Sequence, residues 1–216
     1  MSLDSAMIFA AGFGTRMGSL TKDMPKPMLE IGGRPMIDFC IRLLKQAGIR
    51  TLVANTHYLP EKIETHLQDQ GVITFREDPI LETGGGLRNA LSHLRSDAVI
   101  TMNPDVFWQG RNPVTFLRES WKPSMMGLLM LSGDREKISD FSLEKGYLSR
   151  KGPYRYTGLQ GIRTDMLHDI KEEVFSLNTY WDHLMDRGPL NGVVYDGTWL
   201  DIGTQAALSA ARAQFK

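Results

Sequence analysis

Residues 6–28 read AMIFAAGFGTRMGSLTKDMPKPM, an apolar run that leads into a glycine-rich turn followed by cations. A short apolar run bounded by glycine is typical of a buried strand. Gly12 and Gly14 let the backbone approach a triphosphate closely and turn its N–H groups toward anionic oxygens. Arg16 adds a planar, permanently charged fork suited to phosphate, and Lys26, with a proline on each side, adds a point charge on a restrained backbone. The stretch therefore predicts a strand that ends in a phosphate-binding turn.

A glycine turn after a strand is by itself a weak indication, because dinucleotide-binding and P-loop proteins contain one too. Gly14 is followed by Thr15 and Arg16, so the GxxxxGK[ST] pattern of a P-loop is not present, and the third glycine of a dinucleotide fingerprint is missing as well. The alternative explanation is a plain strand-to-helix turn with a solvated arginine and lysine.

The composition limits the classes of protein to consider. A chain of 216 residues can bury a core of its own. Its 25 cationic and 25 anionic residues argue against a generally basic nucleic-acid binder. The single cysteine, Cys40, lies in a helical apolar pattern, so we expect a core residue and no disulfide or cysteine metal cluster. No apolar run reaches about 18 residues and the first six residues do not resemble a signal peptide, so we expect a cytoplasmic protein outside the membrane.

Apolar runs alternate with amphipathic segments in the first part of the chain, and several of the amphipathic segments open with proline, which a first helical turn tolerates. Such alternation predicts an α/β fold with a mostly parallel sheet covered by helices. We expect strands at 6–10, 51–55, 72–76, 98–102 and 126–131, and helices at 35–47, 60–68, 85–94 and 113–121.

The pattern changes after Ser132. We expect strands at 141–149 and 154–162 with a turn at 151–153, short strands at 192–195 and 199–201, and helices at 164–170, 177–187 and 205–215. No repeat, low-complexity tract or Pro/Ser-rich linker divides the chain, so we expect a single domain over residues 1–216. Its second half should cover the open end of the sheet and supply the site of a second substrate.

Two aspartates at the ends of predicted strands are candidate metal ligands. Asp105 follows the strand at 98–102, and Asp201 ends the strand at 199–201. Ligands of open α/β sheets bind beyond the carboxyl ends of the strands, and Mg²⁺ takes one or two protein carboxylates together with water and phosphate oxygens. Each aspartate alone is also explained as a turn, helix-cap or surface residue. The two lie far apart in the sequence, so their spacing does not establish that they meet.

Two further glycine positions stand out. Residues 79–86, PILETGGG, precede the helix expected at 85–94, and three glycines let a backbone lie flat against a planar base and read its edge. The alternative is a helix-capping loop. Gly158, inside a predicted strand, indicates either the close approach of a ligand or a bulge.

We interpret His57, which follows the strand at 51–55, as a structural histidine rather than a catalytic base.

Seven segments occur in order along the chain: AAGFGTRM, PKPMLEIGGRPMI, NTHYLPEKIETHL, ILETGGG, NPDVFW, YTGLQGI and TWLDIGT. Together they resemble the sugar-1-phosphate nucleotidyltransferases over nearly the whole chain. The short length and the ETGGG segment are most similar to the small bacterial uridylyltransferases that act on N-acetylmuramate 1-phosphate. The resemblance implies a three-layer Rossmann-like, GT-A-like fold with a mostly parallel mixed central sheet. It also implies that residues 1–132 mainly bind the nucleotide and residues 133–216 mainly the sugar phosphate.

The implied reaction joins a nucleoside triphosphate and a sugar 1-phosphate to give a nucleotide sugar and pyrophosphate. In the family pattern Arg16 and Lys26 are catalytic, and Asp105 and Asp201 hold Mg²⁺ or Mn²⁺. The matching nucleotide-binding residues are Ala10, Ala11, Gly12, Gly14, Thr15, Arg16, Lys26, Glu82, Thr83, Gly84 and Gly85. The matching sugar-phosphate-binding residues are Glu82, Asn103 and Gly158.

This sequence departs from the family pattern at two positions. Ser19 replaces a proline, which loosens the loop over the triphosphate. Pro104 replaces a glycine before the metal aspartate, which fixes φ and removes a backbone N–H. Pro104 has one of two consequences: a displaced Asp105 or a more rigid turn. A catalytically weak member or a non-catalytic nucleotide-binding module is therefore an alternative.

Other activities of the same fold also stay open. Mannose-1-phosphate guanylyltransferases share these motifs, and a phosphocholine cytidylyltransferase would need an aromatic cage, for which the sequence offers Tyr154, Tyr156, Trp181 and Trp199. The four tryptophans are scattered without a basic stripe, so we expect no nucleic-acid partner. The expected partners are the two small-molecule substrates, and the expected assembly is a monomer or a homodimer.

Overall fold

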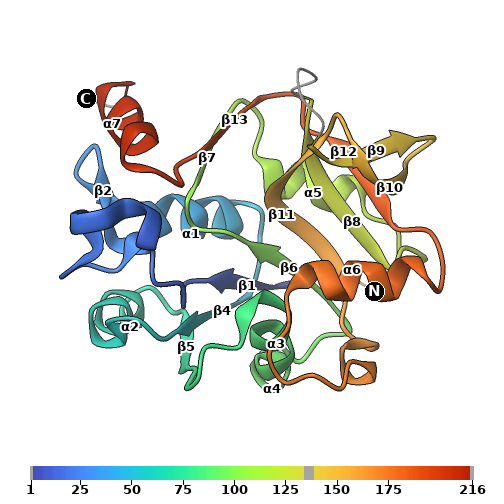
Figure 1. The fold of residues 1–216 in the computed structure, drawn as a ribbon, viewed down its shortest axis with the longest axis horizontal. Coiled ribbons are helices and arrows are strands. Elements are labelled where there is room, and N and C mark those ends of the chain that lie inside the picture. The colour runs from blue at the N-terminus through green and yellow to red at the C-terminus, as the bar shows by residue number, and fades with distance from the viewer. Residues whose placement is uncertain (1, 134–138, 215–216) are drawn as a thin grey trace.

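The structure is a computed structural model and describes residues 2–133 and 139–214. A nine-stranded mixed sheet runs through the molecule in the order β5-β4-β1-β6-β11-β8-β12-β10-β9 (Figure 1). Strands β10 and β11 run against the other seven. The strands are β1 (Ser5–Phe9), β4 (Thr51–Thr56), β5 (Ile73–Arg76), β6 (Ala98–Met102), β8 (Gly127–Ser132), β9 (Ser139–Glu144), β10 (Tyr147–Gly152), β11 (Arg155–Arg163) and β12 (Asn191–Val194).

Helices cover both faces of this sheet because its central strands are apolar on both sides. Ala6 and Ile8 of β1 face one core with residues of α1 (Met36–Gln46), α2 (Pro60–Gln68) and α5 (Pro113–Ser120), whereas Met7 faces a second core. The second core contains residues of α3 (Glu82–Asn89), α4 (Leu91–Leu94) and α6 (Leu177–Met185). Such two-sided burial is what a mostly parallel sheet requires. The predicted three-layer α/β fold is confirmed.

Several predicted boundaries were wrong. The strand expected at 141–149 is two strands, β9 and β10, because Lys145 and Gly146 both adopt positive φ and reverse the chain there. The segment 164–170 forms only a short 3₁₀ turn, η3 (Leu167–Asp169). The helix expected at 85–94 begins earlier, as α3, and is interrupted at Ala90 before α4. The second glycine cluster therefore lies inside a helix rather than ahead of it.

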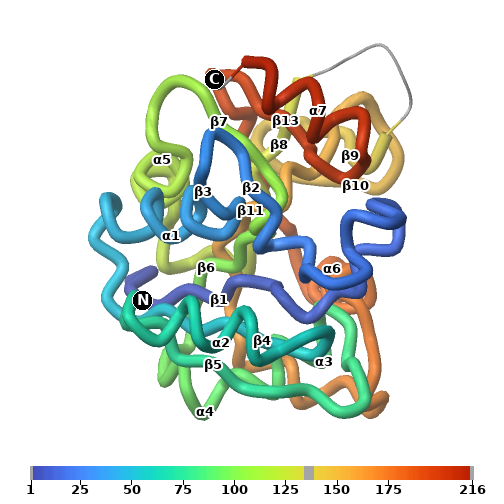
Figure 2. Tube along the Cα trace, turned by 90° about the vertical axis from the view of Figure 1, so that its left-hand side faces the viewer, coloured from blue at the N-terminus to red at the C-terminus, as the bar shows by residue number. Residues whose placement is uncertain are grey.

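A smaller unit holds the glycine-rich loop against the sheet. Strands β7 (Val106–Gln109) and β13 (Thr198–Asp201) pair with each other, and β2 (Glu30–Ile31) pairs with β3 (Arg34–Pro35). The C-terminal helix α7 (Gln205–Gln214) lies near β2 (Figure 2). It packs Leu208 and Ala211 into a third core with Met17 of η1 (Thr15–Thr21), close to η2 (Lys26–Met28). The end of the chain thus supports the turn near its start.

None of the helices within residues 2–133 and 139–214 combines the length and the apolar character needed to cross a membrane.

Candidate active site

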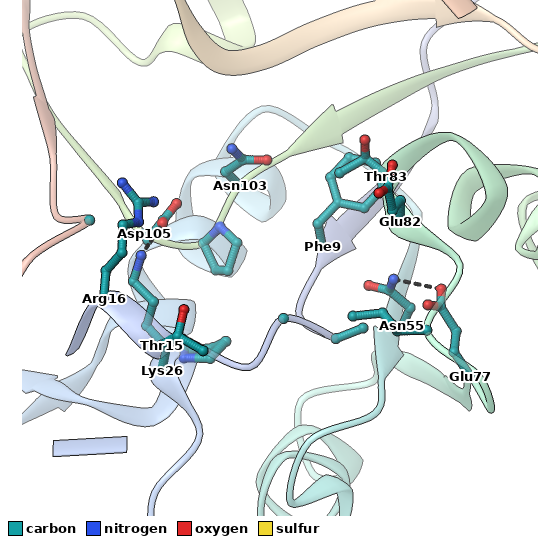
Figure 3. A pocket seen from close by; sticks show the side chains of 17 residues that line it. Phe9, Thr15, Arg16, Lys26, Asn55, Glu77, Glu82, Thr83, Asn103 and Asp105 are labelled. Carbon is teal, nitrogen blue, oxygen red and sulfur yellow. Dashed lines mark hydrogen bonds and ion pairs between the residues drawn. The ribbon is translucent and has the colours of Figure 1, made fainter. Parts of the chain in front are cut away.

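One cavity of about 300 Å³ opens at the carboxyl ends of β1, β4 and β6, where an open α/β sheet places its ligand. Figure 3 shows two groups of side chains across it. Arg16, Lys26 and Asp105 gather at one end, which we call the charged end. Asn55, Glu77, Glu82 and Thr83 lie at the other, which we call the amide end. Of the predicted residues, the lining contains Ala11, Gly12, Gly14, Thr15, Arg16, Lys26, Glu82, Thr83, Asn103 and Asp105.

The glycine turn after β1 borders open space. A Cβ built on Gly12 would meet nothing within 4 Å, whereas one on Gly14 would lie 2.9 Å from the Cβ of Lys26. Gly14 has a φ of 66°, a conformation that glycine adopts without strain. The hydroxyl of Thr21 lies 3.1 Å from the Gly14 carbonyl oxygen and 3.2 Å from that of Gly18. The Thr21 hydroxyl thus holds the turn, and the close approach of Lys26 leaves no room for a side chain at Gly14.

The charged end brings the two aspartates together. Asp105 directly precedes β7, and Asp201 ends the paired strand β13, opposite Val106. The backbone N–H of Ile202 donates to the carbonyl oxygen of Asp105 over 2.8 Å. The antiparallel pairing of β7 with β13 therefore supplies the proximity that sequence spacing left open.

Each of these carboxylates is paired with a cation. The ammonium of Lys26, which is 9% exposed, donates to Asp105 Oδ2, a pair drawn as a dashed line in Figure 3. Arg155 Nη2 lies 3.2 Å from Asp201 Oδ2. A Cβ on Gly203 would lie 2.9 Å from both Asp201 Oδ1 and Arg16 Nη1, so Asp201 lies beside the lining residue Gly203. The pair of Arg155 and Asp201 thus lies beside the charged end, outside the cavity lining.

Pro104 does not carry Asp105 away from the cavity. Pro104 and Asp105 form a turn between β6 and β7, and both line the cavity. The preceding N–H, that of Asn103, donates to the Gly158 carbonyl oxygen over 2.9 Å. Of the two consequences considered for this proline, the geometry favours the more rigid turn.

The amide end rests on a buried carboxylate. Asn55 and Glu77 are each 3% exposed. Asn55 Nδ2 donates to Glu77 Oε1 over 2.7 Å, the Leu81 N–H donates to Glu77 Oε2 over 3.0 Å, and Asn55 Oδ1 accepts from the Ala10 N–H over 2.9 Å. The network joins the ends of β1 and β4 to the segment before α3. It therefore holds in place the backbone that leads into Glu82 and Thr83. Glu82 has a φ of 59°, a strained conformation of the kind found at functional sites.

Five predicted site residues lie outside the cavity lining: Ala10, Gly84, Gly85, Gly158 and Asp201. The N–H groups of Gly84 and Gly85 both donate to the Phe175 carbonyl oxygen, so they do not face a base. A Cβ on Gly84 would lie 2.4 Å from the Phe175 ring, and one on Gly85 2.5 Å from the Glu173 carbonyl oxygen. The close packing of α3 on residues 173–176 accounts for these glycines. Of the predicted residues in this segment, Glu82 and Thr83 line the cavity, and their contact with a nucleotide stays a prediction.

Gly158 coincides with a bulge. The register of β11 against β8 shifts between Tyr156 and Gln160, and Gly158 has a φ of 83°. A Cβ there would lie 3.0 Å from the side chain of Asn103. Of the two explanations that the sequence offered, the bulge is present, and a contact with the sugar stays a prediction.

His57 and Cys40 have structural environments. Nδ1 of His57 lies 2.8 Å from the Glu77 carbonyl oxygen, and the Phe13 ring packs edge-on against the imidazole at 5.1 Å. Cys40 is buried in the core of α1, and burial raises the pKa of its thiol. Both observations match the roles expected for these residues.

The sequence analysis missed several residues of the site. Phe9, Asn55, Glu77 and Gly203 line the cavity, and Arg155 pairs with Asp201. Asn55 and Glu77 occur at or directly after the ends of the parallel strands β4 and β5, so their positions carried a usable signal. Arg155 begins β11, and its position in the sequence gave no such signal, because its pairing depends on Asp201, 46 residues away.

Comparison with known proteins agrees with this geometry. A sequence profile of the MobA-like NTP transferase domain matches residues 6–141. N-acetylmuramate α-1-phosphate uridylyltransferase from Caulobacter vibrioides is 32% identical, over 97% of this chain and 96% of its own length. D-glycero-α-D-manno-heptose 1-phosphate guanylyltransferase from Campylobacter jejuni is 26% identical, over 92% of this chain and 94% of its own length.

A solved structure shows the same fold. The crystal structure of HddC from Yersinia pseudotuberculosis complexed with GMP-PN superposes with a TM-score of 0.82 at 20% identity, covering 99% of this chain and 100% of that one. The profile match over more than half of the chain, together with a full-length relative above 30% identity, assigns the protein to the MobA-like NTP transferase family, as a nucleotidyltransferase of the sugar-1-phosphate type.

Proposed function

We propose that this protein transfers UMP from UTP to the phosphate of N-acetylmuramate 1-phosphate, giving a UDP-sugar and pyrophosphate. The observation that carries the proposal is that a glycine turn, Arg16, Lys26 and Asp105 converge at one end of one cavity. A glycine turn beside two cations, with Arg155 next to Asp201, suits a triphosphate and a second phosphate. The choice of base and sugar follows the Caulobacter vibrioides relative.

In this proposal the glycine turn holds the departing phosphates. The N–H groups at Gly12 and Gly14 and the guanidinium of Arg16 bind the β- and γ-phosphates of the nucleotide. Glu82 and Thr83, at the amide end, contact the nucleoside, and Asn103 lies where the sugar phosphate enters. Residues 1–132 then serve mainly the nucleotide and residues 133–216 mainly the sugar phosphate.

The reaction needs no general base, because the attacking sugar phosphate is already an anion. One of its oxygens attacks the α-phosphorus in line, a new P–O bond forms, and the bond from the α-phosphorus to the bridging oxygen of pyrophosphate breaks. Lys26 neutralises the charge that develops around the α-phosphate, and Arg16 that on the departing pyrophosphate. Positioning and charge neutralisation of this kind supply most of the catalysis of phosphoryl transfer.

The donor set at the charged end fits a divalent cation. Asp201 ends β13, and Asp105 directly precedes the paired strand β7. Within residues 2–133 and 139–214 no group of three or more His, Cys, Asp or Glu side chains forms a metal cluster. Mg²⁺ commonly takes one or two carboxylates and completes its shell with water and phosphate oxygens. We therefore propose that these two aspartates hold Mg²⁺ or Mn²⁺, which would supply charge neutralisation between the phosphates.

A guanylyl transfer is the second candidate, because a relative of nearly the same length is a heptose 1-phosphate guanylyltransferase. A phosphocholine cytidylyltransferase is less well supported. Its aromatic cage would need open ring faces, yet Arg150 already lies over the Trp181 ring and Arg155 over the Trp199 ring, each 5.4 Å from the centroid.

Pyrophosphate release tests the proposal. The purified protein with Mg²⁺ is assayed with UTP, GTP, CTP and dTTP against N-acetylmuramate, mannose, heptose and glucose 1-phosphates and phosphocholine. We expect the highest kcat/KM with UTP and N-acetylmuramate 1-phosphate. A preference for GTP with mannose or heptose 1-phosphate would replace the substrate pair and keep the reaction. No release with any pair, while nucleotide binding is measurable, would contradict the proposal.

A further inference from the structure

Arg155 occupies a position that neither the family motifs nor the cavity lining explain. It opens β11, three residues before the bulge at Gly158, and its side chain is 54% exposed. The guanidinium lies 3.2 Å from Asp201 Oδ2 and 5.4 Å from the centroid of the Trp199 ring. The Trp199 indole is fixed in turn, because its Nε1–H donates to the Thr157 carbonyl oxygen over 2.8 Å. Arg155 is therefore held at the charged end by a stacking contact and an ion pair.

The two ion pairs at this end use the same carboxylate groups that a divalent cation would need. Lys26 binds Oδ2 of Asp105, and Arg155 binds Oδ2 of Asp201. A cation on these aspartates competes with both side chains, since like charges a few ångströms apart repel. If the metal takes Asp201, the guanidinium loses its partner but keeps its stacking contact with Trp199. An arginine in that state has free donors in a fork that matches a phosphate.

We propose that Arg155 is a phosphate-binding residue with two partners. Without metal it pairs with Asp201, and with metal and substrates bound it transfers to the phosphate of the sugar 1-phosphate acceptor. The acceptor is the partner because Arg155 belongs to the second half of the chain and approaches Asp201 from β11, whereas the glycine turn and Arg16 approach from the nucleotide side. This inference rests on the proposed function for the identity of the acceptor, but its metal-binding half does not.

The first test measures metal binding without substrates. Mn²⁺ affinity of the unliganded protein is determined by electron paramagnetic resonance for wild type, Arg155→Met and Arg155→Lys. Removing one positive charge near the two carboxylates should tighten Mn²⁺ binding by about fivefold in Arg155→Met, and Arg155→Lys should stay close to wild type. Arg163→Met is the matched control, because it removes an Arg–Asp pair with Asp165 at the far end of the same strand. Its Mn²⁺ affinity should be unchanged.

The second test measures turnover. Arg155→Met should raise the KM for the sugar 1-phosphate by about tenfold or more, the usual effect of losing a charged hydrogen bond to phosphate, and should leave the KM for the nucleotide within twofold. Arg155→Lys should recover part of the loss. If Arg155 only ties β11 to β13, its replacement would change thermal stability without a selective change in the KM for the sugar 1-phosphate or the nucleotide. Arg163→Met should keep both KM values.

The outcomes separate the inference from the proposed function. Unchanged Mn²⁺ affinity in Arg155→Met, or a tightened affinity with an unchanged acceptor KM, would overturn the role of Arg155. If wild type turns over no sugar 1-phosphate, the proposed function fails. Calorimetric binding of inorganic phosphate in the presence of Mn²⁺ then tests the inference, and it fails too if Arg155→Met binds phosphate as tightly as wild type.

Discussion

The two glycine clusters of this protein look alike in the sequence and serve opposite purposes. Around Gly12 the backbone faces a cavity, and a Cβ would meet nothing within 4 Å. Around Gly84 and Gly85 the backbone faces other parts of the chain, and a Cβ would lie 2.4 to 2.5 Å from the Phe175 ring and the Glu173 carbonyl oxygen. The first cluster, which we call the open cluster, borders the cavity at Gly12, and the second, which we call the packed cluster, lets a helix pack closely.

The difference teaches what a glycine run can and cannot predict. Glycine is required wherever a Cβ would be in the way, but the sequence does not say whether the obstacle is a substrate or another segment of the protein. The residues beside each cluster are more informative. Cations follow the first cluster, whereas the segment that packs on the second lies about 90 residues away. Substitutions at the two clusters should therefore affect different properties.

The largest effect is expected beside the open cluster, at Lys26. Lys26→Ala should lower kcat by about a thousandfold, because one charged group that stabilises the transition state is commonly worth 10²–10³ in rate. The fold should persist, since alanine adds no atom near Gly14, where space is already tight. Steady-state pyrophosphate release and thermal unfolding of the same preparation measure the two properties.

The control for this substitution is Lys45→Ala. Lys45 also donates to an oxygen, the Gln70 carbonyl, but it lies outside the cavity lining. Its kcat should equal that of wild type. Turnover of Lys26→Ala within tenfold of wild type would remove Lys26 from the proposed mechanism.

A smaller effect, on stability rather than on rate, is expected at the packed cluster. Gly84→Ala places a methyl group 2.4 Å from ring carbons of Phe175 and 2.8 Å from the Ser176 carbonyl oxygen. Overpacking of this kind costs about 1–3 kcal/mol of unfolding free energy, which urea denaturation can measure. The KM for the nucleotide should change less than the stability does.

The steric cause can be checked with a second substitution. Phe175→Leu removes part of the ring that the new methyl group would strike. The double variant Gly84→Ala/Phe175→Leu should therefore be less destabilised than the sum of the two single variants, by about 1 kcal/mol. Strict additivity would mean that the strain lies elsewhere, for example against the backbone of Ser176.

Much of the fold was predictable because its signals are local. The strands at β1, β4, β6 and β8 are short apolar runs, and the helices α2 and α5 begin at Pro60 and Pro113, as expected. The strand β7 was missed because Val106–Gln109 pairs with β13, about 90 residues further along the chain, and no local pattern reveals that partner. The break between β9 and β10 depends on the positive φ of Lys145, a residue type that seldom adopts it.

The site was predictable to the extent that its residues share one edge of the sheet. The glycine turn, Asn103 and Asp105 follow β1 and β6 directly, and the structure gathers them in one cavity. The base-facing role given to Gly84 and Gly85 depended on the direction of their N–H groups, which only the contact with Phe175 reveals. The pairing of Asp201 with Arg155 depends on three strands meeting. The residue types of the site could be read from the sequence, whereas the long-range contacts between them could not.

The smallest effect is expected at Gly12, where it sharpens the comparison most. Gly12→Ala adds a methyl group to open space, so the unfolding free energy should stay within about 0.5–1 kcal/mol of wild type, with any gain coming from the unfolded chain. The methyl group intrudes where we place the β- and γ-phosphates, so the KM for the nucleotide should rise about tenfold, which corresponds to about 1.4 kcal/mol. Equilibrium binding of a non-hydrolysable nucleotide analogue measures the same quantity without turnover. Loss of stability with unchanged nucleotide affinity would reverse the roles assigned to the two clusters, because Gly12 would then be a packing residue like Gly84.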